Sequence, residues 1–113
     1  MGASKNCPTD NELAAKAMVH INQLAIQEIR QKNYKRALDY FTQSLVLEEK
    51  LGMKAQVGKS FYNMAGVYFL MEDYENALHK AQLAEALFKG EGQTSDAEKA
   101  RNMIFEIDGK MAR

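Results

Sequence analysis

The sequence has little of several residue types that mark particular protein classes. Cys7 is the single cysteine among 113 residues, so an internal disulfide is excluded. One proline and seven glycines are too few for an all-β chain with many tight turns. Fifteen Lys and Arg balance fifteen Asp and Glu, and the chain therefore lacks the net positive charge typical of nucleic-acid binders. We expect no nucleic-acid partner.

Long apolar runs are also missing. No stretch approaches the roughly 20 apolar residues that cross a bilayer, and the first residues show no signal-peptide pattern. We therefore expect no membrane association and a reducing, cytoplasmic location. The composition that remains, 46% hydrophobic and 27% charged, is that of a folded globular chain of one domain.

Apolar residues recur at helical spacing in five segments that are joined by short connections. Residues 1–8 lack this period and are predicted to form a flexible tail. Thr9 to Glu12 has the form of a capping box, as has Ser95 to Glu98, and Asp73 has the form of an N-cap. Gly52 is a plausible helix stop, and residues 90–94 are predicted to form a loop. We expect an all-α domain over residues 9–113, with stacked antiparallel helical hairpins at about 12–51 and 55–90 and a last helix at about 95–111.

The chain matches itself at a shift of forty residues. Each matched pair keeps its size and polarity, so the two copies are expected to bury equivalent faces. The pairs are Ile21 and Phe61, Leu24 and Met64, Ala25 and Ala65, Asn33 and Asp73, Tyr34 and Tyr74, Ala37 and Ala77, Leu38 and Leu78, and Leu47 and Leu87.

This pattern resembles the tetratricopeptide repeat in its variety of roughly forty residues. The second copy supplies Phe61, Met64, Ala65, Tyr68, Tyr74, Ala77, Ala81 and Ala84. The first copy supplies Ile21, Leu24, Ala25, Tyr34, Ala37, Phe41 and Ser44, with Glu28 where the family prefers Tyr. The resemblance implies a right-handed α-solenoid fragment of about two repeats. The last helix has Phe105 where a small residue belongs, and is therefore predicted to cap the stack. The alternative is that the chain is part of a longer array.

The resemblance also implies a concave groove, lined by the first helix of each hairpin, that binds a peptide or helix of a partner protein. The family register predicts that its binding residues are Asn22, Gln23, Ile26, Arg30, Lys59, Tyr62, Asn63, Lys99 and Asn102. Gly66, Leu70 and Glu106 fall on the same face. Asn63 is the most informative of these, because its amide can both donate to and accept from a peptide backbone.

A narrower alternative is binding of chaperone C-terminal tails through the family's carboxylate clamp. Asn63 and Lys99 match the clamp, whereas Asn22, Ile26 and Met103 replace a Lys, an Asn and an Arg. The loss of three polar contacts disfavours tight carboxylate capture.

Catalytic and metal-binding patterns are missing from the sequence. His20 and His79 have no acidic or cysteine companions at ligand spacing, and no zinc-protease, nucleophile-elbow or phosphate-loop motif occurs. His20 is predicted to be a partly exposed helix residue, and Met64, Met71, Met103 and Met111 to fill the core. We therefore expect a non-enzymatic adaptor without cofactor or metal, whose partner is a protein or peptide. The alternative is a structural module that assembles with further copies of itself.

Overall fold

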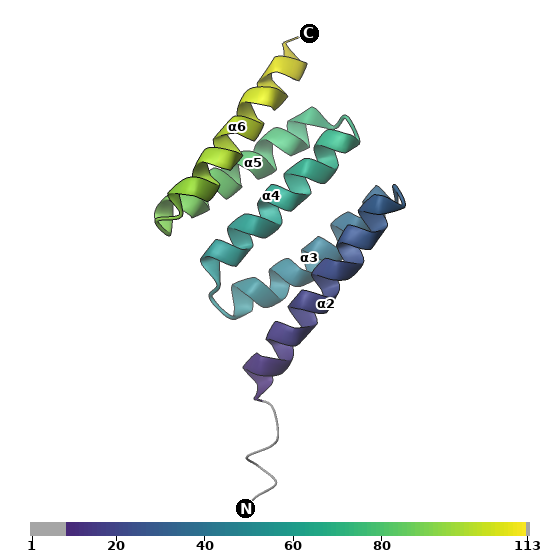
Figure 1. Cartoon of the computed structure of the whole chain (residues 1–113), viewed down its shortest axis with the longest axis vertical. Coiled ribbons are helices and arrows are strands. Elements are labelled where there is room, and N and C mark those ends of the chain that lie inside the picture. The colour runs from purple at the N-terminus through teal and green to yellow at the C-terminus, as the bar shows by residue number, and fades with distance from the viewer. Residues whose placement is uncertain (1–8, 113) are drawn as a thin grey trace, which may run out of the picture.

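The computed structural model describes residues 9–112 and shows five helices in this part of the chain, without a strand (Figure 1). Their bounds are α2 (Asp10–Arg30), α3 (Tyr34–Lys50), α4 (Lys54–Leu70), α5 (Tyr74–Gly90) and α6 (Thr94–Met111). Consecutive helices run antiparallel, so that α2 with α3 and α4 with α5 form hairpins and α6 packs on α5 (Figure 1). The predicted class of stacked helical hairpins is confirmed. The expected tail, with Cys7, lies outside the described residues.

Every helix except the last ends in the same three-residue turn. The turn residue with positive φ is Lys32, Gly52, Glu72 or Gly92, with φ between 60° and 70°. Its amide donates to the carbonyl three residues back, and the next amide donates to the carbonyl five residues back, as in Gly52 to Glu49 and Met53 to Glu48. This is the Schellman arrangement, which satisfies the last carbonyls of a helix. Since it recurs every twenty residues, the turns keep the hairpins in register.

The helix starts confirm two of the predicted caps and correct a third. The Thr9 side chain accepts a hydrogen bond from the Glu12 amide, and the Asp73 side chain accepts one from the Asn76 amide. The capping box predicted at Ser95 is wrong, because α6 already begins at Thr94 and its N-cap is Gln93, which makes no side-chain cap. The Schellman turn after α5 sets this start, and the loop is correspondingly shorter, 91–93 instead of 90–94.

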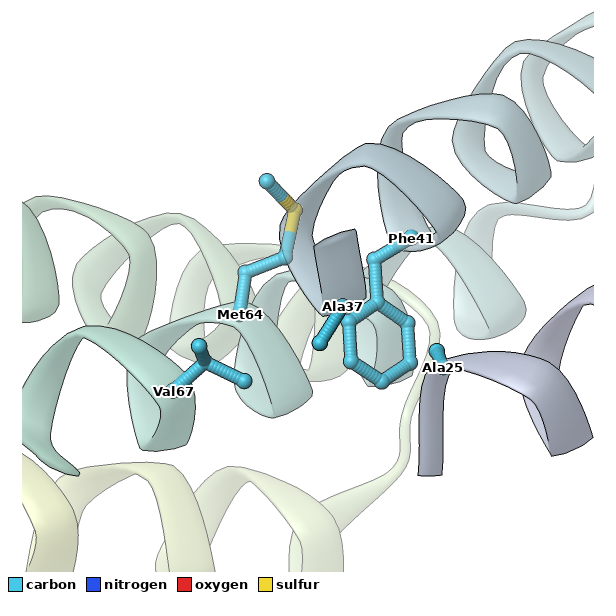
Figure 2. Close-up of a cluster of buried hydrophobic side chains, with 5 residues drawn as sticks. All are labelled: Ala25, Ala37, Phe41, Met64 and Val67. Carbon is cyan, nitrogen blue, oxygen red and sulfur yellow. The ribbon is translucent and has the colours of Figure 1, made fainter. Parts of the chain in front are cut away.

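The core lies between the helices as a series of small clusters. In the first, Phe41 of α3 packs between α2 and α4, with Ala25 on one side and Val67 on the other (Figure 2). Ala25 and its repeat partner Ala65 are fully buried. Small residues at these two positions let neighbouring helices approach closely, as the repeat pattern predicted.

The two ends of the stack differ from the sequence prediction. On α6, Ile107 is buried and Ile104 is partly buried, as expected for a helix that packs against α5. Met111 is exposed, so its predicted role in the core is wrong, because within residues 9–112 its side chain packs against none of the buried clusters. Leu13 is exposed for the same reason at the start of α2, which is longer than the other helices.

Candidate functional site

Three helices, α2, α4 and α6, lie side by side on one face of the stack, with α3 and α5 behind them (Figure 1). Three adjoining hollows lie on this face, two between α4 and α6 and one between α2 and α4. Tyr62 lines all three. We call the three hollows together the groove.

The hollow between α2 and α4 is apolar. It has a volume of about 220 Å³, and its walls include Ile26 and Ile29 from α2, and Tyr62, Gly66 and Leu70 from α4. Ile26 is 45% exposed and Leu70 is 53% exposed. Exposed aliphatic side chains around a concavity offer a place where a partner's apolar side chain can leave water.

Four polar or charged side chains line the hollow between α4 and the start of α6, which we call the polar hollow. Its volume is about 220 Å³, and it is lined by Lys59 and Asn63 of α4 and by Asp96 and Lys99 of α6, over Tyr62 and Phe88. Among the described residues, neither lysine is within 4.0 Å of a carboxylate. Both ammonium groups can therefore bond to a ligand without first breaking an ion pair.

The third hollow joins the other two further along α4 and α6. It measures about 260 Å³ and includes Gly66, Leu70, Lys99, Asn102 and Glu106. Because it shares Lys99 with the polar hollow and Leu70 with the apolar one, the groove is continuous across the three helices.

A surface salt bridge links α6 to α5 next to this wall of the groove. Arg101 donates through Nε to Glu85 Oε2 at 3.0 Å, and Lys89 Nζ lies 3.6 Å from the same oxygen. The hydrogen bond from Arg101 lowers the pKa of Glu85 below its ordinary value.

The structure brings six of the nine predicted binding residues together around the groove: Ile26, Lys59, Tyr62, Asn63, Lys99 and Asn102. The other three, all on α2, line none of the hollows. Gln23 and Arg30 are exposed, whereas Oδ1 of Asn22 is buried without a hydrogen-bond partner. His20 is exposed, in line with the prediction.

Sequence reasoning missed part of the groove wall. Met103 packs against the buried cluster around Ile107, as its assignment to the core predicted, but it also lines two hollows, and Ile29 and Phe69 each line one. The forty-residue shift contains the signal for Met103, because it equates this residue with Asn63. The same shift equates Ile29 with Phe69. Because both are apolar, the sequence alone does not distinguish them from residues of the core.

Another hollow lies away from the groove, between the α3–α4 turn and the end of α5. It is larger, about 470 Å³, and includes Met53, Val57, Leu87 and Glu91. None of the predicted binding residues lines it. Within residues 9–112 no helix is long and apolar enough to span a membrane, and no three His, Cys, Asp or Glu side chains gather as metal ligands.

The helix pairs and the forty-residue register agree with a comparison to known protein families. The family model of the tetratricopeptide repeat matches residues 14–90, which is more than half of the chain. The chain belongs to the tetratricopeptide-repeat family. A comparison with curated proteins found no match. Tetratricopeptide-repeat domains are generally non-catalytic modules of protein–protein interaction.

The repeat also accommodates its main departure from the family pattern, Glu28 in the place of a tyrosine. Glu28 Oε1 accepts a hydrogen bond from Asn33 Nδ2 at 3.0 Å, and Oε2 lies 3.9 Å from Arg36. These contacts join the end of α2 to the start of α3, so the polar residue stabilises the turn of the first hairpin.

Proposed function

We propose that this tetratricopeptide-repeat domain binds a segment of a partner protein in the groove. The observation that carries the proposal is the continuity of an apolar and a polar hollow through Tyr62. An apolar side chain of the partner enters the hollow between Ile26 and Leu70. Asn63, Lys59 and Lys99 then bond to the partner's backbone or to its acidic and amide groups.

The groove differs from a carboxylate clamp in a way that supports an apolar contact. Ile26 and Met103, which stand at two polar positions of the clamp, both line the apolar hollow. Asn22, at a third, has its oxygen buried without a hydrogen-bond partner. A ligand that depends on capture of its carboxylates alone would leave the hollow between α2 and α4 empty.

The test starts by locating the contact in cells with a photo-crosslinking amino acid. We expect the crosslinker to capture a protein when it replaces Tyr62 in the groove. The matched control replaces Gln82, which is exposed on α5. Capture at Gln82 but not at Tyr62 would place the contact on the back of the stack and contradict the proposal.

Affinity for the captured partner then tests the two halves of the groove. Leu70→Asp is expected to weaken binding at least about thirtyfold, since hot-spot contacts contribute about 2 kcal/mol or more. Val46→Asp is the control, because Val46 is 61% exposed on α3 and lines none of the groove hollows. The double variant Lys59→Glu with Asn63→Ala is also expected to weaken binding without unfolding the domain. Unchanged affinity in both groove variants would move the site off this surface.

One observation favours self-assembly as a second function. Phe105 of α6 is 81% exposed on the side of the helix where the register would place a further hairpin. Its neighbours on that side, Arg101 and Asp108, are exposed and charged, where α4 has Phe61 and Tyr68. Light scattering over a concentration series distinguishes the two functions. A mass that rises above 12.8 kDa and falls back in Phe105→Ser would support assembly through α6, whereas a constant mass would support the free groove.

A further inference from the structure

A carboxyl group is buried where the first hairpin meets α4. Glu48 of α3 has no exposed surface. Ser44, one turn earlier on α3, donates a hydrogen bond to Oε2 at 3.0 Å, and Ser60 of α4 donates one to Oε1 at 2.7 Å. Within residues 9–112 no Lys, Arg or His lies within 4.0 Å of this carboxyl group. The group is therefore held by uncharged hydroxyls alone.

The equivalent place in the second repeat is apolar. Forty residues later, Ser44, Glu48 and Ser60 become Ala84, Phe88 and Ala100, which form a buried cluster with Ala97 and are flanked by Tyr62. We call the Ala84, Phe88 and Ala100 contact the second joint, and the Ser44, Glu48 and Ser60 contact the first joint. The same shift equates Tyr62 with Asn22, whose oxygen is buried without a partner. The first joint is thus the polar version of a contact that the protein elsewhere builds from hydrocarbon.

A change of size accompanies the change of polarity. The Phe88 ring fits because Gly58 leaves room for it, and a Cβ on Gly58 would lie 2.9 Å from the ring. The residue equated with Gly58 is Met18, which is buried at the start of the first hairpin. In the second joint a glycine on α4 faces the large Phe88 of α5. In the first joint the longer Met18 on α2 is paired instead with Glu48 on α3, which is smaller than Phe88.

Ionisation of Glu48 has no compensating charge in the first joint. Burial raises the pKa of Glu48 above its ordinary value, and the two serine hydrogen bonds offset only part of this shift. The charged side chain that acts on it is Glu49, which raises the pKa further. From α2 the register brings Met18 and Asn22 to this place and from α4 Val57 and Ser60, none of which titrates.

We propose that the first joint is a proton-dependent hinge, at which the α2–α3 hairpin is held firmly on α4 while Glu48 is neutral and loosens when Glu48 ionises. The loosening acts on the groove because α2 and α4 supply the walls of its apolar hollow. The second joint has no titrating side chain and stays closed. The hinge acts in the free domain, so it can be tested without a bound partner, and its test does not depend on the proposed binding function.

The direction of the pH dependence follows from the raised pKa. Below the ordinary pKa of a glutamate, Glu48 is protonated whether the joint is open or closed, and the joint has its full stability. As the pH rises above that value, the opened state loses its proton first, so the opening equilibrium increases about tenfold per pH unit. The increase stops above the pKa of the closed state.

Hydrogen exchange of backbone amides against pH tests the hinge, with rates corrected for the intrinsic base-catalysed exchange. We expect the protection of amides in α2 and α3 to fall with rising pH while amides in α5 and α6 keep theirs. Glu48→Gln is expected to remove this difference, because its amide does not ionise. Glu49→Gln is the matched control on the exposed neighbour, and is expected to keep most of the pH dependence.

A second variant, Ser60→Ala, tests the hinge if Glu48→Gln folds poorly. Ser60→Ala retains the carboxyl group but removes one of the hydrogen bonds that favour its ionised form, which raises the pKa of Glu48 in the closed joint further. The loosening is therefore expected to begin at the same pH as in the native chain, but to continue to a higher pH and to reach a larger total loss of protection. If Glu48 acted through packing alone, the protection of the α2 and α3 amides would depend on pH in the same way in Ser60→Ala and in the native chain. Loss of protection that is equal over all five helices, or that persists in Glu48→Gln, would overturn the hinge.

Discussion

Two glycines in α4 allow opposite effects of one substitution to be compared within a single helix. A Cβ on Gly58 would lie 2.9, 3.1 and 3.3 Å from three atoms of the Phe88 ring. Carbon atoms in contact are normally about 3.5–4.0 Å apart. Phe88 is only 2% exposed and is packed against three buried alanines, so its ring has little room to move. Around Gly66 a Cβ would meet no atom within 4 Å.

The expected magnitudes follow from two terms. Gly→Ala inside a helix stabilises by about 1 kcal/mol, which applies to both positions. Overpacking a closed core costs about 1–3 kcal/mol, which applies only to Gly58. Gly66→Ala should therefore increase the free energy of unfolding by about 1 kcal/mol, and the two variants should differ by about 1–3 kcal/mol.

Urea unfolding followed by circular dichroism measures this difference. The Phe88→Leu substitution provides an internal control, since the smaller side chain makes room for the new methyl group. Phe88→Leu should cost less stability in the Gly58→Ala background than in the native chain, with a coupling energy of about 0.5–3 kcal/mol. If Gly58→Ala is as stable as Gly66→Ala, or if the coupling is zero, the close approach of α4 to Phe88 does not limit the packing.

Three further predictions concern the turns, a cap and a surface salt bridge. Lys32→Gly and Glu72→Gly should each stabilise the domain by about 1 kcal/mol in thermal or urea unfolding, because both residues have positive φ. Asp73→Ala should reduce the free energy of unfolding by about 1 kcal/mol, because it removes the side-chain cap of α5. Arg101→Gln should cost less than about 1 kcal/mol at neutral pH, since the pair with Glu85 lies at the surface. The lowered pKa of Glu85 gives stability above its ordinary value that is lost as the pH falls, so this last difference should disappear in acid.

Each of these predictions has an outcome that contradicts it. Destabilisation by glycine at residue 32 or 72 would mean that side-chain contacts of the native residue outweigh the backbone strain. An unchanged stability in Asp73→Ala would mean that water replaces the cap at no cost. A difference between Arg101→Gln and the native chain that persists in acid would assign the effect to packing of the arginine stem instead of the ion pair.

The local pattern of the sequence was sufficient for the helices and for the family. The apolar period of 3.6 residues predicted five helices, and the forty-residue shift predicted which faces they bury. Ala25 and Ala65 were correctly expected at close crossings, because a small residue that recurs among large ones marks a place where two helices approach each other. The groove face followed from the same register, and six of the nine predicted residues meet there.

The tertiary structure decided what lies opposite each side chain. Glu48 is an ionisable residue, but its side chain is fully buried, because the hydroxyl groups of Ser44 and Ser60 donate hydrogen bonds to it there. Met111 and Leu13 continue the apolar pattern but are exposed, since in the described part of the chain neither side chain packs against a buried cluster. A helical period determines which residues share a face, but packing between helices distant in sequence determines whether that face meets water, a hydrocarbon or a hydroxyl group. For this reason the repeat could be read from the sequence, whereas the polar first joint emerged only from the folded chain.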